Sequence, residues 1–291
     1  MDKILLNKTA LITGATQGLG KEIAIKLAEE GANLILCARN KDKLENIKTE
    51  LEKSKLSSQT ILIKSIDVSL EKDIKSLTKF TFKNFKTCEI LINNAGIYGP
   101  KGAFEKLNFK EWLKSIEVNF IGSAMLCYYF LPFFKKQNYG KIIQLSGGGA
   151  TKPMPNISGY ASSKAAIVRL VETLAEEAKS YKIDINSIAP GALNTSMLDE
   201  VLSSGPNKVG KEYYEKSLKQ KLNGGESFDN AVNLVLFLAS SQSDGISGKL
   251  ISAIWDNWAL WPEHKNILQN SDVYTLRRIV GKDRQMNWGD R

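Results

Sequence analysis

Two side chains in this sequence have types and a spacing that suit proton chemistry. Tyr160 and Lys164 lie four residues apart, and residues with this spacing on a helix share one face. A phenol titrates at a pKa of about 10 in water, and an ammonium group within a few ångströms lowers that pKa. The sequence therefore predicts that Lys164 prepares Tyr160 to act as an acid and a base. A tyrosine that only packs beside a solvated lysine has the same spacing, so the interpretation depends on the rest of the chain.

A glycine-rich turn near the N-terminus supplies part of that context. An apolar run over residues 8–14 ends in Gly14, and Gly18 and Gly20 follow before a helical pattern begins. Glycine lets such a turn tighten, and it lets backbone N–H groups at the start of a helix approach a phosphate. The turn therefore predicts a bound nucleotide, although its spacing alone is a weak match because it differs from the commoner G-x-G-x-x-G.

Strands and helices alternate along the chain. Apolar runs typical of buried strands occupy 8–14, 33–38, 60–66, 90–92, 140–145, 183–188 and 249–254, and helical patterns occupy 41–55, 71–86, 109–136, 158–180 and 228–240. Such alternation predicts an α/β fold, with one doubly wound parallel sheet of seven strands, helices on both faces and right-handed crossovers. We assign residues 1–254 to this single domain.

Two segments interrupt the alternation. Residues 195–226 are too long for an ordinary connection, and we interpret them as a lid over a binding site; the alternative is an insertion without such a role. Residues 255–291 form a C-terminal extension that is too rich in aromatic residues to be a loose tail, with Trp255, Trp258, Trp261, Tyr274 and Trp288. We expect this extension to pack on the domain or on a partner subunit.

The composition is that of an average soluble globular protein, because hydrophobic residues make up 43 % and charged residues 24 % of the chain. The longest apolar stretch, 121–134, is interrupted by Gly122 and Pro132. It is shorter than the roughly 20 residues that span a bilayer, so we interpret it as a core helix. The apolar segment at the N-terminus is too short for a signal peptide, which favours a cytoplasmic protein that is not bound to a membrane.

Cysteine, histidine and charge argue against several classes of site. Cys37, Cys88 and Cys127 are scattered, and His264 is the only histidine in the sequence. This pattern disfavours a disulfide framework, a metal site and histidine-based catalysis. The net charge of +9 suits anionic ligands. We expect no nucleic acid, because the lysines are interleaved with glutamates along helices and no nucleic-acid-binding motif appears.

Several motifs together resemble those of the short-chain dehydrogenase/reductase family. They are the glycine turn, the run 93–96 (Asn-Asn-Ala-Gly) after the fourth strand, Asn119, the Tyr160 and Lys164 pair, and Pro190-Gly191 after the sixth strand. They occur in the family's order and at its spacing, over residues 8–254. The resemblance implies a Rossmann-type fold, an NAD(P)-dependent oxidoreductase that acts on CH–OH groups of a small-molecule substrate, and a homodimer or homotetramer.

The resemblance also implies roles for the matching residues. Tyr160 would exchange a proton with the substrate oxygen while hydride moves to or from the nicotinamide. Lys164 would lower the pKa of Tyr160 and hold the nicotinamide ribose, and Asn119 would bind a water that links Lys164 to solvent. The cofactor would contact Tyr160 and Lys164 together with Gly14, Thr16, Gln17, Gly18, Leu19, Gly20, Arg39, Asp67, Val68, Asn93, Ala95, Gly96, Pro190, Gly191, Leu193 and Thr195.

The choice of cofactor is set about 20 residues beyond the glycines, where an acidic side chain would accept the 2′-hydroxyl of NAD. The sequence there is Cys37-Ala38-Arg39-Asn40 and contains no acid. The planar guanidinium of Arg39 could pair with a 2′-phosphate, so we predict NADP. NAD stays as the alternative, because Arg39 could instead stack on adenine and Gln17 is not the basic residue that many NADP-dependent relatives carry in the turn.

One position departs from the family pattern. The family normally has a serine thirteen residues before the tyrosine, where it binds the substrate carbonyl, and this chain has Gly147 there. Ser146 lies one residue earlier, and a shift of one residue on a strand reverses the direction of the side chain. Because the glycines that follow permit a bulge, we predict that Ser146 serves as the catalytic serine. Otherwise Ser158 or the N–H groups of the glycine loop would hold the oxygen, or the chemistry is not simple carbonyl reduction.

These observations favour an NADP-dependent oxidoreductase that interconverts a secondary alcohol and a ketone. The basic charge and the aromatic extension lean toward a sugar, a polyol or a phosphorylated metabolite, with a 3-oxoacyl thioester as the runner-up. Two further hypotheses stay open. One is a dinucleotide-binding sensor or partner subunit with little turnover, and the other is an epimerase or dehydratase that recycles its cofactor.

Overall fold

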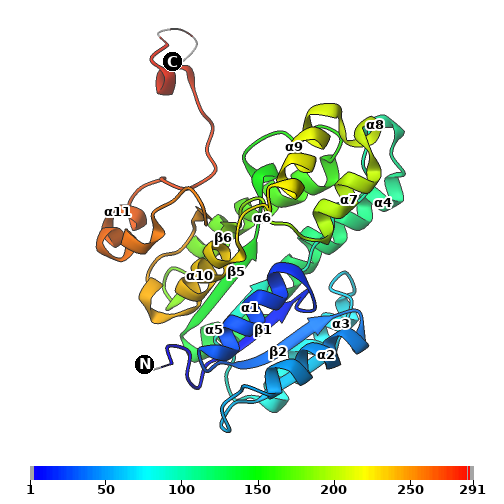
Figure 1. Cartoon of the computed structure of the whole chain (residues 1–291). Coiled ribbons are helices and arrows are strands. Elements are labelled where there is room, and N and C mark those ends of the chain that lie inside the picture. Colours follow the sequence, from blue (N-terminus) through cyan, green and yellow to red (C-terminus); the bar gives the residue numbers. More distant parts are fainter. Residues whose placement is uncertain (1–2, 287, 289–291) are drawn as a thin grey trace.

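Seven parallel strands form the centre of the computed structural model, which describes residues 3–286 and 288 (Figure 1). Their order across the sheet is β3-β2-β1-β4-β5-β6-β7. The strands are β1 (Thr9–Thr13), β2 (Asn33–Ala38), β3 (Ile61–Ser65), β4 (Ile90–Asn93), β5 (Gly140–Leu145), β6 (Ile183–Ala189) and β7 (Leu250–Ser252). The order reverses between β1 and β4, and ligands of such sheets bind at this switch point, beside the carboxyl ends of the strands.

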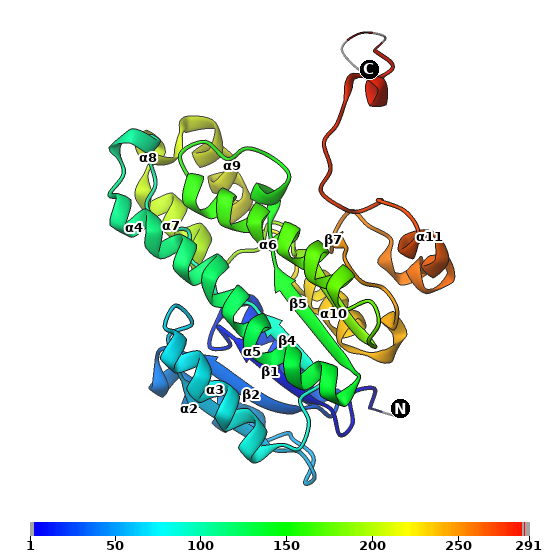
Figure 2. The same cartoon turned by 180° about the vertical axis from the view of Figure 1, so that it is seen from behind.

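Helices cover both faces of the sheet, as Figures 1 and 2 show from opposite sides. One face carries α1 (Gly18–Glu29), α2 (Lys41–Glu52) and α10 (Phe228–Ala239). The other face carries α3 (Glu71–Asn84), α5 (Gly122–Gln137) and α6 (Ser158–Glu177). The predicted fold class, a doubly wound parallel α/β sheet of seven strands, is therefore confirmed.

Alternation of side chains along each strand builds two separate cores. On β1, Ala10 and Ile12 pack with α1 and α10, whereas Leu11 faces the core beneath α3 and α5. Successive side chains of a strand point to opposite faces, so a parallel strand covered on both sides must be apolar throughout. This requirement explains why the strands read as continuous apolar runs in the sequence.

The last strand is shorter than predicted, and its end has a local cause. β7 stops at Ser252, whereas the apolar run extends to Ile254. The hydroxyl oxygen of Ser252 accepts hydrogen bonds from the backbone N–H groups of Ile254 (3.3 Å) and Trp255 (3.1 Å). Ala253 still donates to Ala189 of β6 (3.0 Å), and the bonds to Ser252 then fold the chain into a turn that ends the ladder.

Residues 109–137 form one long helical run made of α4 (Phe109–Ile116), a π-helical turn (Glu117–Ile121) and α5. Among the described residues this run alone is long and apolar enough to cross a membrane, by length and composition only. Core helices of globular proteins pass the same test. Leu126, Phe130 and Phe134 of α5 are buried against the sheet, which agrees with the predicted core helix.

The segment 195–226 contains three helices, α7 (Ser196–Ser204), α8 (Pro206–Val209) and α9 (Lys211–Leu222), which cluster beside α4 (Figure 1). Gly205 and Gly210 join these helices with φ angles of 75° and 87°. Side chains other than glycine rarely adopt such angles, so the glycines permit the sharp changes of direction. The helices lie over the carboxyl edge of the sheet, where the glycine turn also lies.

The segment after β7 packs on the domain in its first part. It contains the short helix α11 (Lys265–Gln269). Trp258 contacts Phe237 with ring centroids 5.4 Å apart, and the buried Trp261 contacts Tyr274 at 4.4 Å. Beyond Leu276 the chain runs away from the sheet (Figures 1 and 2). Residues 287 and 289–291 of the predicted extension, and residues 1–2 of the predicted domain, lie outside the described residues.

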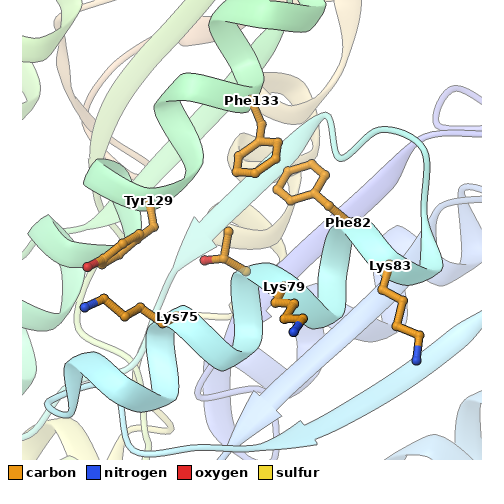
Figure 3. A pocket seen from close by; sticks show the side chains of 7 residues that line it. Lys75, Lys79, Phe82, Lys83, Tyr129 and Phe133 are labelled. Atoms are coloured by element: carbon orange, nitrogen blue, oxygen red, sulfur yellow. The ribbon is translucent and has the colours of Figure 1, made fainter.

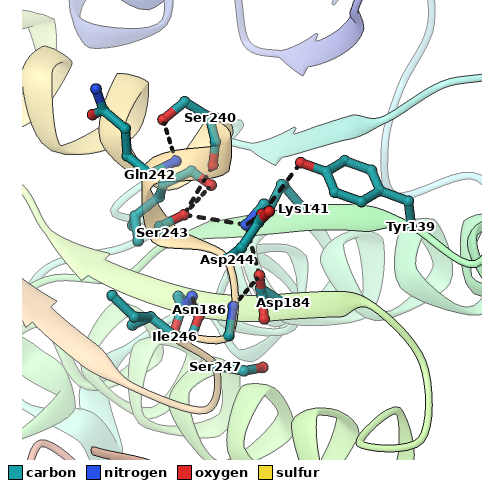
Figure 4. A network of polar contacts seen from close by, with 12 residues as sticks. Tyr139, Lys141, Asp184, Asn186, Ser240, Gln242, Ser243, Asp244, Ile246 and Ser247 are labelled. Atoms are coloured by element: carbon teal, nitrogen blue, oxygen red, sulfur yellow. Dashed lines mark hydrogen bonds and ion pairs between the residues drawn. The ribbon is translucent and has the colours of Figure 1, made fainter. Parts of the chain in front are cut away.

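A buried ion pair ties the strands together at the edge opposite the glycine turn (Figure 4). The Nζ atom of Lys141, on β5, lies 2.6 Å from Asp184 on β6 and 2.7 Å from Asp244. Burial raises the pKa of Asp184 and the neighbouring Lys141 ammonium opposes that shift. Lys141 therefore supplies the counter-charge for the largely buried carboxylate of Asp184.

We predict that Lys141→Met lowers the free energy of unfolding by about 3 kcal/mol, because it leaves Asp184 buried and unpaired. Urea unfolding measures the change. Lys179→Met is the control, since Lys179 pairs with Glu176 on the exposed surface and should cost below about 1 kcal/mol. Equal effects of the two substitutions would contradict this assignment.

Candidate active site

The glycine turn connects β1 to α1 at the switch point of the sheet. Gly14 and Gly18 have φ angles of 65° and 53°. No side chain caps the N-terminus of α1, and no acidic residue lies in its first turn. The first N–H groups of the helix are thus left for an anion, which fits the pyrophosphate of a dinucleotide.

The second asparagine of the 93–96 run holds this turn in place. The Nδ2 atom of Asn94 donates to the backbone oxygens of Thr13 (3.0 Å) and Gly14 (3.1 Å). The side chain of Asn93 instead points into the core, where its Nδ2 atom lies 3.4 Å from the backbone oxygen of Ser123. The prediction of Asn93 as a cofactor residue is corrected to this extent: its side chain is unavailable, because the alternation of β4 turns it toward α5.

Positive side chains gather beside the turn, at the end of β2. Arg39 is exposed there, and the Nζ atom of Lys43 on α2 donates to Oε1 of Gln17 (3.2 Å). Lys43 was not predicted, although its position four residues beyond Arg39 could have indicated it. Asp67 follows β3, and its Oδ1 atom accepts hydrogen bonds from the backbone and hydroxyl of Ser69. Val68 packs against Gly122, where an added Cβ atom would lie 2.7 Å from the backbone oxygen of Val68.

The loop after β6 faces the same turn. A side chain at Gly18 would meet Thr195 at 3.3 Å, and Gln17 donates to Ser196 (3.0 Å). Leu193 pairs with Glu226 across the base of the segment 195–226. The structure therefore brings the loop that starts at Pro190 and Gly191 to the glycine turn. Thr16 lies in that turn, and Leu19 and Gly20 lie in the first turn of α1.

Tyr160 and Lys164 lie one helical turn apart on α6, as the spacing predicted. The Nζ atom of Lys164 is 5.5 Å from the centre of the Tyr160 ring and donates to the backbone oxygen of Leu145 (2.5 Å). Asn119, in the π-helical turn, is fully buried and donates to Ile97 O (2.9 Å) and Ser163 Oγ (3.0 Å). These three side chains converge beside Gly96, which follows Ala95 at the end of β4: a Cβ atom there would lie 3.3 Å from Asn119 and 3.7 Å from Lys164.

Burial controls the titration of this pair. It lowers the pKa of Lys164 to about 8 and raises the pKa of Tyr160, with Tyr213 as a smaller cause of the rise. The expected lowering of the Tyr160 pKa by Lys164 is therefore not seen, because burial removes water from both groups. At neutral pH the structure has a protonated phenol beside an ammonium that is easily deprotonated.

Ser146 does not face Tyr160, contrary to the prediction. Its backbone N–H continues the ladder to Ile188 (2.8 Å), and its hydroxyl donates to the backbone oxygen of Lys164 (3.4 Å). No bulge has redirected the side chain at this position. The hydroxyl of Tyr160 instead fills the space beside Gly147, where an added Cβ atom would lie 2.7 Å from the phenol oxygen. Ser158, the other candidate, accepts a hydrogen bond from Trp112 (3.1 Å).

Four residues beside or near Tyr160 were not predicted from the sequence pattern: Tyr98 and Tyr213, and an ion pair next to Tyr98. The ring of Tyr98 lies 4.7 Å from that of Tyr160, and its hydroxyl is 3.3 Å from the hydroxyl of Tyr213 on α9. Lys101 pairs with Glu200 on α7 (3.4 Å). Tyr98 lies two residues after the 93–96 run and could have been noticed, but the partners on α7 and α9 depend on tertiary packing.

A hollow of about 540 Å³ between α3 and α5 lies elsewhere on the surface (Figure 3). Its walls combine lysines with aromatic rings: Lys75, Thr78, Lys79, Phe82, Lys83, Tyr129 and Phe133. The hollow opens on the outside of the helical layer, away from the glycine turn and Tyr160. It therefore does not belong to the candidate site.

Cys37, Cys88 and Cys127 are buried free thiols, and among residues 3–286 and 288 there is no cluster of metal-ligating side chains. A nucleotide turn and a tyrosine–lysine pair at the same sheet edge are the arrangement of an enzyme that moves hydride and a proton between a dinucleotide and a small molecule. This class of protein is a dinucleotide-dependent oxidoreductase.

Known proteins identify the family. A family model described as short chain dehydrogenase matches residues 8–204. The chain is 34 % identical over 217 residues to 11-beta-hydroxysteroid dehydrogenase-like 3 of Arabidopsis thaliana, covering 71 % of this chain and 69 % of that protein. It is 31 % identical over 247 residues to the 3-oxoacyl-acyl-carrier-protein reductase of Staphylococcus epidermidis, covering 84 % and 97 %.

A solved structure gives the same answer. The structure of levodione reductase superposes with a TM-score of 0.78 at 26 % identity, covering 88 % of this chain and 98 % of that one. The chain therefore belongs to the short-chain dehydrogenase/reductase family, and it is an oxidoreductase of a family that uses NAD(P).

We predict that Gly147→Ala lowers kcat by about 10- to 100-fold, because the new methyl group displaces the Tyr160 hydroxyl from its position. The measurement is NAD(P)H-linked turnover with any carbonyl substrate that the wild type reduces. Gly148→Ala is the matched control, since a Cβ atom there meets nothing within 4 Å. Equal activities of the two variants would contradict the close approach of Tyr160 to Gly147.

Proposed function

We propose that this chain is an NADP-dependent oxidoreductase that interconverts a secondary alcohol and a ketone, with Tyr160 as the acid and base. The observation that carries the proposal is the position of Tyr160, one helical turn from a buried ammonium and beneath α9. The raised pKa of Tyr160 keeps the phenol protonated at neutral pH, as an acid for ketone reduction requires.

Each residue has a defined part in this reaction. Bound nicotinamide supplies hydride to the carbonyl carbon, or accepts it in the oxidative direction. In reduction, the proton of the Tyr160 hydroxyl passes to the carbonyl oxygen and leaves a phenolate, which the nearby Lys164 ammonium stabilises. Asn119 fixes the loop at Ile97 against Ser163 of α6, and so holds the site together. The water-binding role expected for Asn119 stays part of the proposal.

The proposed preference for NADP depends on Arg39 and Lys43. Their two positive charges lie beside the glycine turn, at the strand end where NAD-dependent relatives would carry an acid. A 2′-phosphate would form charge-assisted hydrogen bonds with both side chains. The cofactor contacts expected from the sequence, from Gly14 to Thr195, belong to the same proposal.

We predict that Arg39→Ala weakens NADPH binding by about 10- to 100-fold, the loss expected when a hydrogen bond between charged groups is removed. Binding is followed by the fluorescence of the reduced cofactor. NADH is the internal control, because it lacks the 2′-phosphate and its affinity should change little. A wild-type protein that binds NADH more tightly than NADPH would overturn the preference for NADP.

The substrate class is inferred from the polar groups around Tyr160. The phenol groups of Tyr98 and Tyr213 lie next to it, and the ion pair of Lys101 and Glu200 lies beside Tyr98. Such groups suit a substrate with several oxygen atoms, so we favour a sugar, a polyol or a phosphorylated metabolite. A 3-oxoacyl thioester is the second candidate, supported by the likeness to the 3-oxoacyl-acyl-carrier-protein reductase over 97 % of that protein.

We predict that Tyr160→Phe abolishes turnover while NADPH binding is retained, because only the transferable proton is removed. The assay follows NADPH absorbance with a panel of sugars, polyols, simple ketones and a 3-oxoacyl thioester. Activity restricted to apolar ketones would contradict the preferred substrate class. Full activity of Tyr160→Phe would contradict the assignment of Tyr160.

The proposed organisation assigns residues 1–254 to one catalytic domain, 195–226 to a lid and 255–291 to an extension. We also propose a cytoplasmic homodimer or homotetramer that binds neither nucleic acid nor membrane. Exposed apolar side chains on the helical run 109–137 support an association of copies: Phe109, Leu113, Ile121, Tyr128 and Phe133 are each at least 37 % exposed.

A further inference from the structure

Tyr98 and Tyr213 form a pair of hydroxyl groups next to Tyr160. Tyr98 follows β4, and its ring lies 4.7 Å from the Tyr160 ring at an angle of 57°. Its hydroxyl oxygen is 3.3 Å from that of Tyr213 on α9. Burial raises the pKa of Tyr98 most, and the Tyr160 and Tyr213 hydroxyls raise it further, so the group stays a neutral O–H donor.

Counting hydrogens shows that this pair has one donor to spare. Two phenol hydroxyls carry two hydrogens, and the bond between them uses one. Among the described residues, the contact with each other is the one hydrogen bond that these hydroxyls make. When Tyr213 donates to the Tyr98 oxygen, the Tyr98 hydrogen is free to point toward a ligand beside Tyr160.

The site lacks a serine hydroxyl at the position where the family has one, so a second hydrogen-bond donor to the substrate oxygen must come from another residue. Gly147 stands where a serine hydroxyl would bind the substrate oxygen, and the Ser146 hydroxyl is used by the backbone of α6. Tyr160 supplies one donor from α6, and the Ser158 hydroxyl on that helix is held against the Trp112 indole (3.1 Å). A carbonyl that becomes an alkoxide-like oxygen during hydride transfer gains strongly from a second positioned donor.

An ion pair lies beside Tyr98 and connects its loop to α7. Lys101 lies three residues after Tyr98, and its largely buried side chain pairs with Glu200 on α7 (3.4 Å). The Lys101 ammonium also lies 5.4 Å from the centre of the Tyr98 ring. The loop after β4 is thus joined to α7 by the ion pair and to α9 by the hydrogen bond between Tyr98 and Tyr213.

We propose that Tyr98 donates the second hydrogen bond to the substrate oxygen, in place of the serine that Gly147 replaces, and that Tyr213 is a positioning residue that orients the Tyr98 hydroxyl. This inference rests on the proposed carbonyl–alcohol chemistry of Tyr160. It makes turnover depend on α9, because the orienting hydroxyl is carried by that helix.

The test compares Tyr98→Phe, Tyr213→Phe and Tyr214→Phe with the wild type. The assay is NADPH-linked reduction of dihydroxyacetone, ethyl acetoacetate and cyclohexanone. Loss of the Tyr98 hydroxyl should lower kcat/KM by about 100-fold, the effect of removing one oxyanion donor. Loss of the Tyr213 hydroxyl should lower it by about 5-fold, the effect of one neutral hydrogen bond. Tyr214, on the same helix, is the matched control and should leave activity unchanged.

An infrared measurement separates donation from a merely structural role. The carbonyl stretch of a ketone from this panel is recorded in its complex with the enzyme and NADP⁺, where no hydride can be transferred to it. We expect the stretch to move to higher frequency in Tyr98→Phe, because the carbonyl loses a hydrogen bond, while the KM for NADPH stays the same.

Two results would overturn the inference in different ways. An active wild type with an equally active Tyr98→Phe and an unchanged carbonyl stretch would exclude donation by Tyr98 and leave the proposed function intact. A wild type that reduces no ketone of the panel would remove the proposed function, and this inference with it.

Discussion

The ammonium group of Lys164 is buried at the carboxyl edge of the sheet, and the candidate site depends on how the protein holds it there. A charged amine without water is costly unless polar groups surround it. Here the backbone oxygen of Leu145, at the end of β5, accepts its hydrogen bond at 2.5 Å. Burial lowers the pKa of Lys164 to about 8, so the ammonium is charged at neutral pH but loses its proton at a pH only slightly higher. Tyr160 lies on the same helix and shares this environment.

The fold explains why these groups meet. The carboxyl ends of the parallel strands lie at one edge of the sheet. The glycine turn follows β1 there, Gly96 follows β4, and the end of β5 carries the backbone oxygen that Lys164 contacts. The face of the sheet that carries α3, α5 and α6 completes the site. Tyr160 and Lys164 lie on α6, and Asn119 lies in the π-helical turn before α5. π-Helical turns are rare and frequent at functional sites. The turn places a fully buried asparagine against Ile97 and Ser163, which fixes the loop after β4 relative to α6.

The sequence predicted those features that follow from local periodicity. Apolar runs and their alternation with helices identified the seven strands, and a spacing of four residues identified the shared face of Tyr160 and Lys164. Features that depend on tertiary packing were missed or predicted wrongly. Ser146 keeps the strand ladder and points away, the Asn93 side chain points into the core, and burial reverses the expected pKa shift of Tyr160. Tyr98 and Tyr213 meet across more than a hundred residues, which no local pattern records.

The account's central claim is that the buried Lys164 ammonium supports the proton chemistry, and the pH dependence of kcat/KM for NADPH in ketone reduction tests it most directly. This parameter reports on the enzyme before the cofactor binds. Lys164 is charged below its pKa and neutral above it, so kcat/KM should be level at neutral pH and fall as the pH rises through about 8. Lys164→Arg, whose guanidinium does not titrate in this range, should lack the fall in whatever activity it retains. A wild-type profile that stays level to pH 10, or a fall that persists in Lys164→Arg, would contradict the claim.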